Sequence, residues 1–237
     1  PDQLPENAAL RASHAPLPKF VEAAMRTPLL FPPGTEYRYS SMAILLATEI
    51  AQRISGTPFP DFVAESIYRP LEMHRSAMGP GQFSLDELMP CQVEYAAPES
   101  GAGDPTTKNW DWNSPYWRQL AAPWGGAHGS ASDVARFLSE FLHPTGRALA
   151  PETARLMITN HNPAGFHTRG LGFDIGTGAG GKGCSEVTFG HTGSTGTLCW
   201  ADPKSDTICV ILTTLPGKAV DPHPRNLASD RVAEWMG

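Results

Sequence analysis

The sequence predicts an α+β fold, in which helices come first, an antiparallel sheet follows and a last helix closes the chain. Two observations support this order. Segments at helical spacing, separated by Pro- and Gly-rich loops, fill the first part of the chain, whereas the last third holds short runs typical of strands. The 237 residues, 41% of them hydrophobic, are enough for one large domain or two interleaved ones.

Three helices are expected before residue 71. Residues 18–27 form a short amphipathic candidate, and a Pro-Pro-Gly breaker follows them. Residues 40–55 are almost all apolar and end at Gly56, a typical helix stop. A helix that is apolar around most of its circumference is expected to be buried. Residues 60–70, with a proline at each end, form the third candidate.

Residues 76–124 show the least regular pattern of the chain. They carry few periodic apolar positions but many aromatic side chains, and such long loops are usually either functional or disordered. The aromatic residues are Trp110, Trp112, Tyr116, Trp117 and Trp124.

Regular patterns return at residue 130. Ser130 and Asp133 form a plausible capping box, and apolar residues at helical spacing continue to residue 142. A short helix is expected at 151–159. Strands are expected at 170–176, 186–191, 196–202 and 206–215, with a hairpin turn at 203–205.

The last strand and the glycine-rich tract complete the expected sheet. Residues 208–212 are apolar without alternation, so both faces of this strand should be covered, one of them by a helix at 225–236. The glycine-rich tract at 176–183 is interpreted as a flexible hairpin loop, because it lacks the strand-to-helix context of a phosphate-binding loop.

Composition excludes several classes of function. The net charge of −6 and the absence of a basic run argue against nucleic-acid binding. No apolar stretch reaches the roughly 20 residues of a membrane span. The eight histidines have no metal-ligand spacing, and no cofactor motif is present. The four cysteines are expected to be reduced thiols, although Cys199 and Cys209 would lie opposite each other if the hairpin turn is centred on Lys204.

Three segments are informative when taken together. The first runs from Pro33-Gly34-Thr35 to Tyr39-Ser40-Ser41, directly before the apolar helix. The second, residues 124–137, is a glycine turn that leads into the capped helix. The third is His191-Thr192-Gly193-Ser194, where small residues on a strand indicate a backbone that another group approaches closely. Each segment alone is weak evidence, because short motifs also arise by chance.

In this order and at these separations, the segments resemble the serine β-lactamase and penicillin-binding-protein family. The likeness is to its class C β-lactamase, D-aminopeptidase and esterase branch. Residues 33–41 are similar to a Pro-Gly-Thr … Tyr-Ser-Asn segment, residues 125–137 to a Gly-Gly … Ser-Thr-Ala-x-Asp-Leu-Ala-x-Phe run, and residues 191–193 to a Lys-Thr-Gly or His-Thr-Gly strand. The resemblance implies a β-lactamase/transpeptidase-like fold, an antiparallel sheet flanked by helices plus a mainly helical subdomain.

The resemblance implies catalysis through an acyl-enzyme on ester, amide or β-lactam-like substrates, formed by a nucleophilic serine. Tyr39 would shuttle the proton of that serine. A phenol needs nearby positive charge to act as a base, which a motif lysine and His191 would supply. Thr192 and Gly193 would line the edge along which substrate lies. The backbone N–H of Ser194 would be one oxyanion donor.

Further substrate contacts are expected from Ser41, Trp117 and Trp124. The tryptophans have two interpretations of equal weight: they form the wall of an acyl pocket, or they close the core of the long loop. Ser41 replaces the asparagine of β-lactamases, and His191 replaces their lysine. Both replacements favour an esterase- or peptidase-like member.

The family's nucleophile motif, Ser-x-x-Lys, is absent from the sequence. The nearest match, Ser66-Ile-Tyr-Arg69, lies downstream of Tyr39 and ends in an arginine, which cannot deprotonate to serve as a base. We therefore expect an N-terminal segment outside this chain. That segment would contain the nucleophile helix and the first two strands of a five-stranded sheet. Without those strands, residues 208–212 would be an exposed apolar edge.

These expectations define the predicted organisation. Residues 1–149 would form the mainly helical subdomain, and residues 150–237 the C-terminal part of the α/β subdomain. The expected partners are a small ester, amide or peptide substrate and the chain's own missing N-terminal segment, in the same or a separate polypeptide. The alternative is a catalytically dead relative that acts as a binding protein.

Overall fold

The protein has the α+β composition that its sequence predicts, and the computed structural model describes residues 6–236. Contacts divide the chain into two compact units. The first comprises residues up to 65 together with 76–128, and the second comprises 66–75 together with the residues from 129 onward. This division differs from the expected one at 149/150, because the helix at 131–142 packs on the sheet of the second unit.

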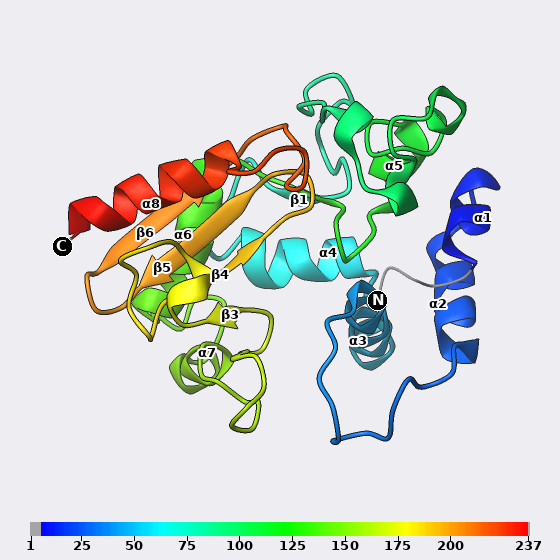
Figure 1. Ribbon diagram of the computed structural model, residues 1–237. Helices are drawn as coiled ribbons and strands as arrows, with labels where there is room; N and C mark the ends of the chain where they lie inside the picture. Colours follow the sequence, from blue (N-terminus) through cyan, green and yellow to red (C-terminus); the bar gives the residue numbers. More distant parts are fainter. Residues whose placement is uncertain (1–5, 237) are drawn as a thin grey trace. The chain divides into compact units, whose positions relative to one another are not determined.

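The α-helices of the first unit occupy the blue to green part of the ribbon in Figure 1. The segments expected at 18–27, 40–55 and 60–70 are all helical, the last of them continuing from α4 into a π-helical turn at Ala64–Tyr68. The helices are α1 (Asn7–Ala12), α2 (Leu17–Arg26), α3 (Ser41–Ser55), α4 (Phe59–Val63) and α5 (Pro115–Leu120).

Helix α3 is less buried than its sequence predicts. Leu45 packs with Phe20 of α2 in a core cluster, and both side chains are almost completely buried. On the other side of the helix, Ile50 and Ile54 keep 58% and 82% of their surface exposed. Within the described residues, α2 and α4 are the helices that contact α3 most, so a large apolar face stays open to solvent.

The long segment 76–124 is held by its own side chains. Asn113 accepts a hydrogen bond from the N–H of Cys91 and donates one to its carbonyl, both at 2.8 Å. Its regular pieces, none of them predicted from the sequence, are α5, the strand β1 and single 3₁₀ turns. Strand β1 (Ala77–Met78) pairs antiparallel with β2 (Ala127–His128), and the turns are Val93–Tyr95, Pro98–Ser100 and Pro105–Thr107.

The second unit is an antiparallel sheet in the order β3-β4-β5-β6. The strands expected in the last third are present, but 170–176 contributes only two strand residues, and part of the glycine-rich tract forms a 3₁₀ turn at Thr177–Ala179. The strands are β3 (Asp174–Ile175), β4 (Phe189–Thr192), β5 (Leu198–Asp202) and β6 (Thr207–Ile211). The helices of this unit are α6 (Ala131–Leu142), α7 (Pro151–Met157) and α8 (Pro224–Met236).

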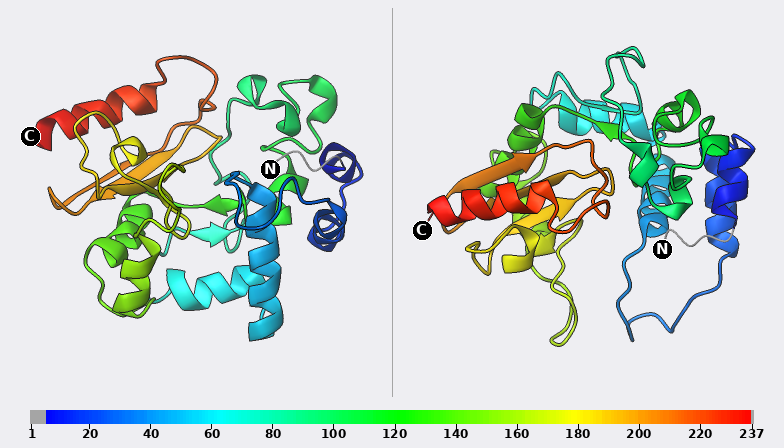
Figure 2. Two further views of the ribbon diagram at one scale, coloured as in Figure 1. Left: turned by 60° about the horizontal axis from the view of Figure 1, so that its bottom comes forward. Right: turned by 45° about the horizontal axis from the view of Figure 1, so that its top comes forward.

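Helices cover both faces of this sheet, α8 on one face and α6 on the other (Figures 1 and 2). On the α6 face, the rings of Phe141, Phe173 and Phe189 pack edge to face, with centroids 4.9 to 6.3 Å apart. On the α8 face, the buried Trp200 donates a hydrogen bond to Ser229 at 2.8 Å. Both faces of β6 are therefore covered, as its uninterrupted apolar sequence predicts.

The hairpin between β5 and β6 corrects the expected cysteine register. Cys199 pairs with Val210, and Cys209 pairs with Trp200, because the turn holds four residues instead of three. Side chains alternate between the two faces along a strand, so a shift of one residue in the pairing register puts two side chains that were expected on the same face onto opposite faces of the sheet. Cys199 packs on the α6 side and Cys209 on the α8 side, and all four cysteines are free thiols.

Within the described part of the chain, β6 is an edge strand, since only β5 pairs with it. Among the same residues, no helix combines the length and apolar character that crossing a membrane requires.

Candidate active site

Tyr39 and Ser41 lie at the start of α3, in the first unit. Ser40 caps the helix, because its hydroxyl accepts a hydrogen bond from the N–H of Ala43 at 3.2 Å. Tyr39 precedes this cap outside regular secondary structure and is 44% exposed, whereas Ser41, in the first turn, is buried. The local sequence therefore places a phenol at the surface, next to the N-terminus of an apolar helix.

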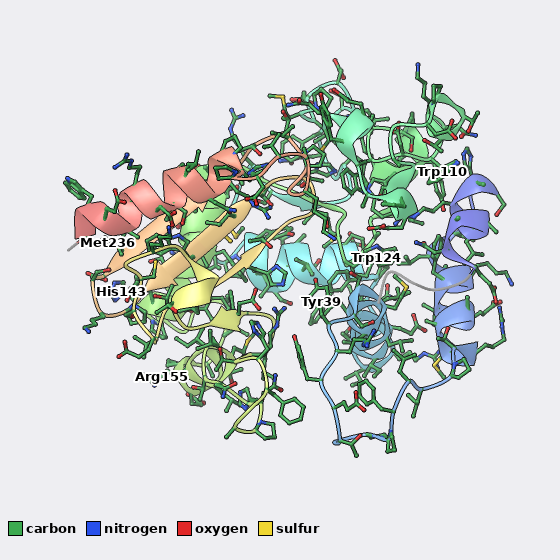
Figure 3. All side chains as sticks on the ribbon, in the orientation of Figure 1. Tyr39, Trp110, Trp124, His143, Arg155 and Met236 are labelled. Carbon is green, nitrogen blue, oxygen red and sulfur yellow. The ribbon has the colours of Figure 1, made fainter. Side chains whose placement is uncertain are left out.

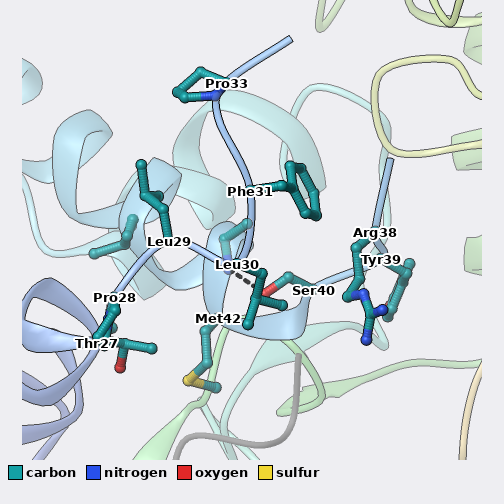
Figure 4. Close-up of a pocket in the computed structure, with 13 residues that line it drawn as sticks. Thr27, Pro28, Leu29, Leu30, Phe31, Pro33, Arg38, Tyr39, Ser40 and Met42 are labelled. Carbon is teal, nitrogen blue, oxygen red and sulfur yellow. Dashed lines mark hydrogen bonds between the residues drawn. The ribbon is translucent and has the colours of Figure 1, made fainter. Parts of the chain in front are cut away.

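A pocket of about 390 Å³ opens beside Tyr39 (Figure 4). The loop before α3 and one side of the helix form its mostly apolar wall, to which Leu30, Phe31 and Met42 contribute. The polar groups in the lining include Arg38, Tyr39 and Ser40. Apolar pockets with a few polar groups are typical ligand or docking sites.

His191, Thr192 and Gly193 lie on and just after β4, in the second unit. His191 pairs with Cys199 of β5, and Thr192 pairs with Leu198. The pairing of β4 with β3 stops earlier, at Gly190, so the other edge of the His-Thr-Gly segment has no strand partner among the described residues. An extended peptide can add to such an edge by main-chain hydrogen bonds.

Both ring nitrogens of His191 are engaged. Nδ1 lies 2.7 Å from the carbonyl of Thr192, and Nε2 lies 2.7 Å from a guanidinium nitrogen of Arg169. A carbonyl only accepts and a guanidinium only donates, so the proton is on Nδ1 and the lone pair of Nε2 accepts from Arg169. Arg169 also forms an ion pair with Asp174, which in turn contacts His167.

These contacts make His191 neutral at pH 7. Burial lowers its pKa, and the charge of Arg169 acts in the same direction, against the opposing effects of the Thr192 carbonyl and Asp174. On the facing strand, burial raises the pKa of the Cys199 thiol to about 11, so that group is neutral too. The positive charge at this strand therefore belongs to Arg169 and not to His191, which corrects the charge that we expected on the imidazole.

Ser194 begins a tight turn after β4. The N–H of Gly193 donates to the carbonyl of Thr197 at 2.9 Å, and the N–H of Gly196 donates to the carbonyl of Gly193 at 3.0 Å. Ser194 is exposed, and its own N–H forms no hydrogen bond within residues 6–236. An exposed, unused backbone donor on a fixed turn is what an oxyanion site requires.

The two tryptophans differ in their surroundings. Trp117 is 5% exposed and packs with Trp112, while the guanidinium of Arg11 lies 4.2 Å above its ring. Trp124, labelled in Figure 3, is only partly buried and contacts Phe20 and Trp117, with ring centroids 5.8 and 5.9 Å away. The structure thus places Trp117 in the core of the first unit, the second of its two interpretations.

The capped helix predicted after the glycine turn is also present. Ser130 accepts a hydrogen bond from the N–H of Asp133 at 3.2 Å, and the carboxylate of Asp133 accepts one from the N–H of Arg75 at 2.7 Å. This segment therefore joins residues 66–75 to the sheet unit.

The sequence-predicted residues fall into two groups. Tyr39, Ser41 and the two tryptophans belong to the first unit, and the residues from His191 to Ser194 belong to the second. Arg169 and Asp174 were not among the predicted site residues. Nothing in their spacing marks them, because Arg169 reaches His191 only through the folding of the loop before β3, and Asp174 of β3 acts through its ion pair with Arg169.

Comparisons with known proteins agree with the fold and the motifs. The family model described as Beta-lactamase matches residues 1–234. A protein of Escherichia coli O157:H7 named D-alanyl-D-alanine carboxypeptidase is 27% identical over 227 residues, which are 87% of this chain and 51% of that protein. The chain spans about half the length of the curated relatives that it matches.

Solved structures show the same fold. A beta-lactamase of Mycobacterium bovis superposes with a TM-score of 0.63 at 22% identity, covering 99% of this chain and 85% of that one. A D-amino acid amidase of Ochrobactrum anthropi SV3 gives a TM-score of 0.65 at 20% identity, with 96% and 66% covered. Because the family model matches almost the whole of this chain, the chain belongs to the beta-lactamase family.

Proposed function

We propose that this chain is part of a serine hydrolase that forms an acyl-enzyme with ester, amide or β-lactam-like substrates. The observation that carries the proposal is the end of β4, where, among residues 6–236, a strand edge without a strand partner leads into the exposed Ser194 with its unused N–H. Such a site fits an acyl group whose carbonyl oxygen becomes negative during the reaction. The named relatives, a carboxypeptidase and an amidase, support the same class of chemistry.

Tyr39 is proposed as the proton shuttle, with Ser41, Thr192 and Gly193 as substrate contacts. Trp124 remains a candidate for the wall of the acyl site because it is only partly buried. The neutral His191 favours an esterase- or peptidase-like member, since it lacks the cationic amine of the Lys-Thr-Gly β-lactamases.

The nucleophile is proposed to lie on a segment outside these 237 residues, because the sequence contains no Ser-x-x-Lys. In the first unit, the apolar pocket beside Tyr39 and the exposed isoleucines of α3 form a surface on which that segment can pack. In the second unit, the edge of β6 that pairs with no described strand offers a place for additional strands. The greater length of the relatives supports this assignment.

The first experiment is an intact-mass measurement of the purified material under denaturing conditions, before and after treatment with a fluorophosphonate. If a second polypeptide, or a longer form of this chain, gains the mass of the probe, the nucleophilic serine lies outside these 237 residues. If only this chain is present and it stays unlabelled, the purified material is not a working hydrolase. If this chain itself gains the mass of the probe, the nucleophile lies within these 237 residues and its placement on an outside segment is refuted.

The role of Tyr39 is tested in the labelled, active preparation. Tyr39→Phe removes the phenolic proton and should lower the acylation rate by roughly two to four orders of magnitude. Tyr95→Phe is the matched control, because Tyr95 is a similarly exposed tyrosine of the same unit, outside the three motif segments. Full acylation by Tyr39→Phe would remove Tyr39 from the mechanism.

A further inference from the structure

Arg225 reaches from the first turn of α8 to the turn that holds Ser194. Its Nη1 donates to the carbonyl of Gly193 at 2.7 Å and to the carbonyl of Thr197 at 3.1 Å. Because these two carbonyls lie on either side of the turn, one guanidinium nitrogen ties its two ends together. All of these residues belong to the second unit.

The contact with Gly193 determines where the N–H of Ser194 points. The Gly193 carbonyl and the Ser194 N–H belong to the same peptide group, which is planar and trans, so they point in opposite directions. Arg225 and the N–H of Gly196 both donate to this carbonyl and hold it toward the inside of the turn. The N–H of Ser194 is therefore directed outward, away from Arg225.

The next peptide is fixed as well. The N–H of Gly217 donates to the carbonyl of Ser194 at 3.0 Å. Gly217 also provides the space in which the guanidinium lies, since a Cβ at this position would be only 2.7 Å from both terminal nitrogens of Arg225. Both peptide groups that flank Ser194 are thus held, and a glycine at 217 lets the guanidinium of Arg225 lie close to the backbone there.

The base of the Arg225 side chain is anchored by a buried histidine. His223 accepts a hydrogen bond from the N–H of Arg225 at 3.1 Å, and its other ring nitrogen contacts the carbonyl of Leu215 at 3.0 Å. Burial lowers the pKa of Arg225, but a guanidinium stays charged in proteins. Charged donors form shorter and stronger hydrogen bonds, and they polarise the peptide that accepts them.

We propose that Arg225 is a positioning residue, which clamps the Gly193 carbonyl so that the N–H of Ser194 is aimed and polarised to receive a substrate oxyanion. The inference rests on the proposed function for its catalytic part, while the clamp itself is a property of this chain. Arg225 touches neither the substrate nor the reacting atoms, and acts through the peptide between Gly193 and Ser194.

The clamp is tested by NMR on the 237-residue chain. Arg225→Ala should shift the carbonyl ¹³C of Gly193 and the amide ¹⁵N and ¹H of Ser194, because the charged donor is lost. Arg225→Lys should restore part of the shift, since lysine keeps the charge and a donor. Gly217→Ala keeps the arginine but displaces its guanidinium, so it should shift the same nuclei.

Arg231→Ala is the matched control. Arg231 lies on the same helix, pairs with Glu234 on the surface and is 83% exposed, so its loss should leave the Gly193 and Ser194 signals unchanged. Unchanged signals in Arg225→Ala would overturn the clamp. A variant that fails to fold is recognised by loss of the whole spectrum, and Gly217→Ala and Arg225→Lys then decide the question.

The catalytic part is tested in the active preparation that fluorophosphonate labels. Arg225→Ala should lower kcat by roughly ten- to a hundredfold, with KM nearly unchanged. This loss is smaller than the loss caused by removing an oxyanion donor altogether, because the hydrogen bond from Gly196 to the Gly193 carbonyl persists. Arg225→Lys should recover part of this loss. Unchanged kcat in a variant whose Ser194 signals have shifted would refute the catalytic role.

The two tests separate the two proposals. If the unaltered protein has no activity and no labelled serine, the proposed function fails and the catalytic role of Arg225 fails with it. The NMR shifts still decide whether Arg225 clamps the turn.

Discussion

Replacing Trp117 by alanine distinguishes its two interpretations, a pocket wall and a core residue. Trp117 is 5% exposed, its ring packs edge to face with Trp124 at 5.9 Å, and the guanidinium of Arg11 covers it at 4.2 Å. Replacing a buried tryptophan by alanine costs about 3–5 kcal/mol, through lost apolar burial and the cavity that remains. The cation–π contact contributes to this cost, because Arg11 is itself buried.

The assay is thermal and chemical unfolding of the chain, followed by circular dichroism so that the signal does not depend on the missing fluorophore. A loss of 3–5 kcal/mol corresponds to a decrease in Tm of roughly 6–20 °C for a chain of this size. Trp235→Ala is the matched control. Trp235 is 90% exposed on α8, so its loss should change the free energy of unfolding by at most about 0.5 kcal/mol.

A double-mutant cycle isolates the contact between the two side chains. Arg11→Met and Trp117→Ala together should cost less than the sum of the two single losses, with a coupling of about 1–2 kcal/mol. If Trp117→Ala is as stable as the unaltered chain, the side chain does not support the core. The interpretation as a pocket wall would then return, with a change in substrate preference as its signature.

Two further predictions concern ionisable groups of the second unit. The pKa of Asp202 is lowered, since the hydrogen bonds from Ser185, Thr188 and Lys204 outweigh the effect of burial. The stabilising contribution of this carboxylate is present above its unfolded pKa of about 3.9 and decreases as the pH falls through the lower folded pKa. Asp202→Asn should therefore make the free energy of unfolding less dependent on pH below about pH 4. An unchanged pH profile would contradict this prediction. For His191, burial lowers the pKa, so an NMR titration should give a midpoint below about 6.5, and stability should decrease as the pH falls below that value, because the unfolded state then binds more protons. Arg169→Gln removes a cation and should raise that midpoint, and a midpoint that does not move would argue against the contact with Nε2.

Local signals in the sequence were sufficient for most elements. Apolar patterns and end signals located α2, α3 and α6, a C-terminal helix was expected where α8 lies, and Ser130 caps α6 as its sequence predicts. The helix α5 also carries such a signal, because Ser114 caps it and Pro115 begins it, but it is too short to show a periodicity within the aromatic segment.

Local sequence signals were not sufficient where contacts between residues distant in the sequence determine the structure. The register of β5 and β6 depends on the length of one turn, and one residue more moves Cys199 and Cys209 to opposite faces of the sheet. The burial of α3 depends on which other elements cover it, so its apolar composition alone overestimated how much of the helix is buried.

The sequence by itself determined the α+β class and the family, and its short motifs predict Tyr39 and His191 to Ser194 as site residues. Only the tertiary structure decided the charge and the geometry around them. Arg169 precedes His191 by 22 residues and Arg225 follows Gly193 by 32, and neither has a periodic or motif relation to its partner. Hydrogen bonding and desolvation act through space, so the neutral state of His191 and the direction of the Ser194 N–H emerge only once the loops and α8 are in place.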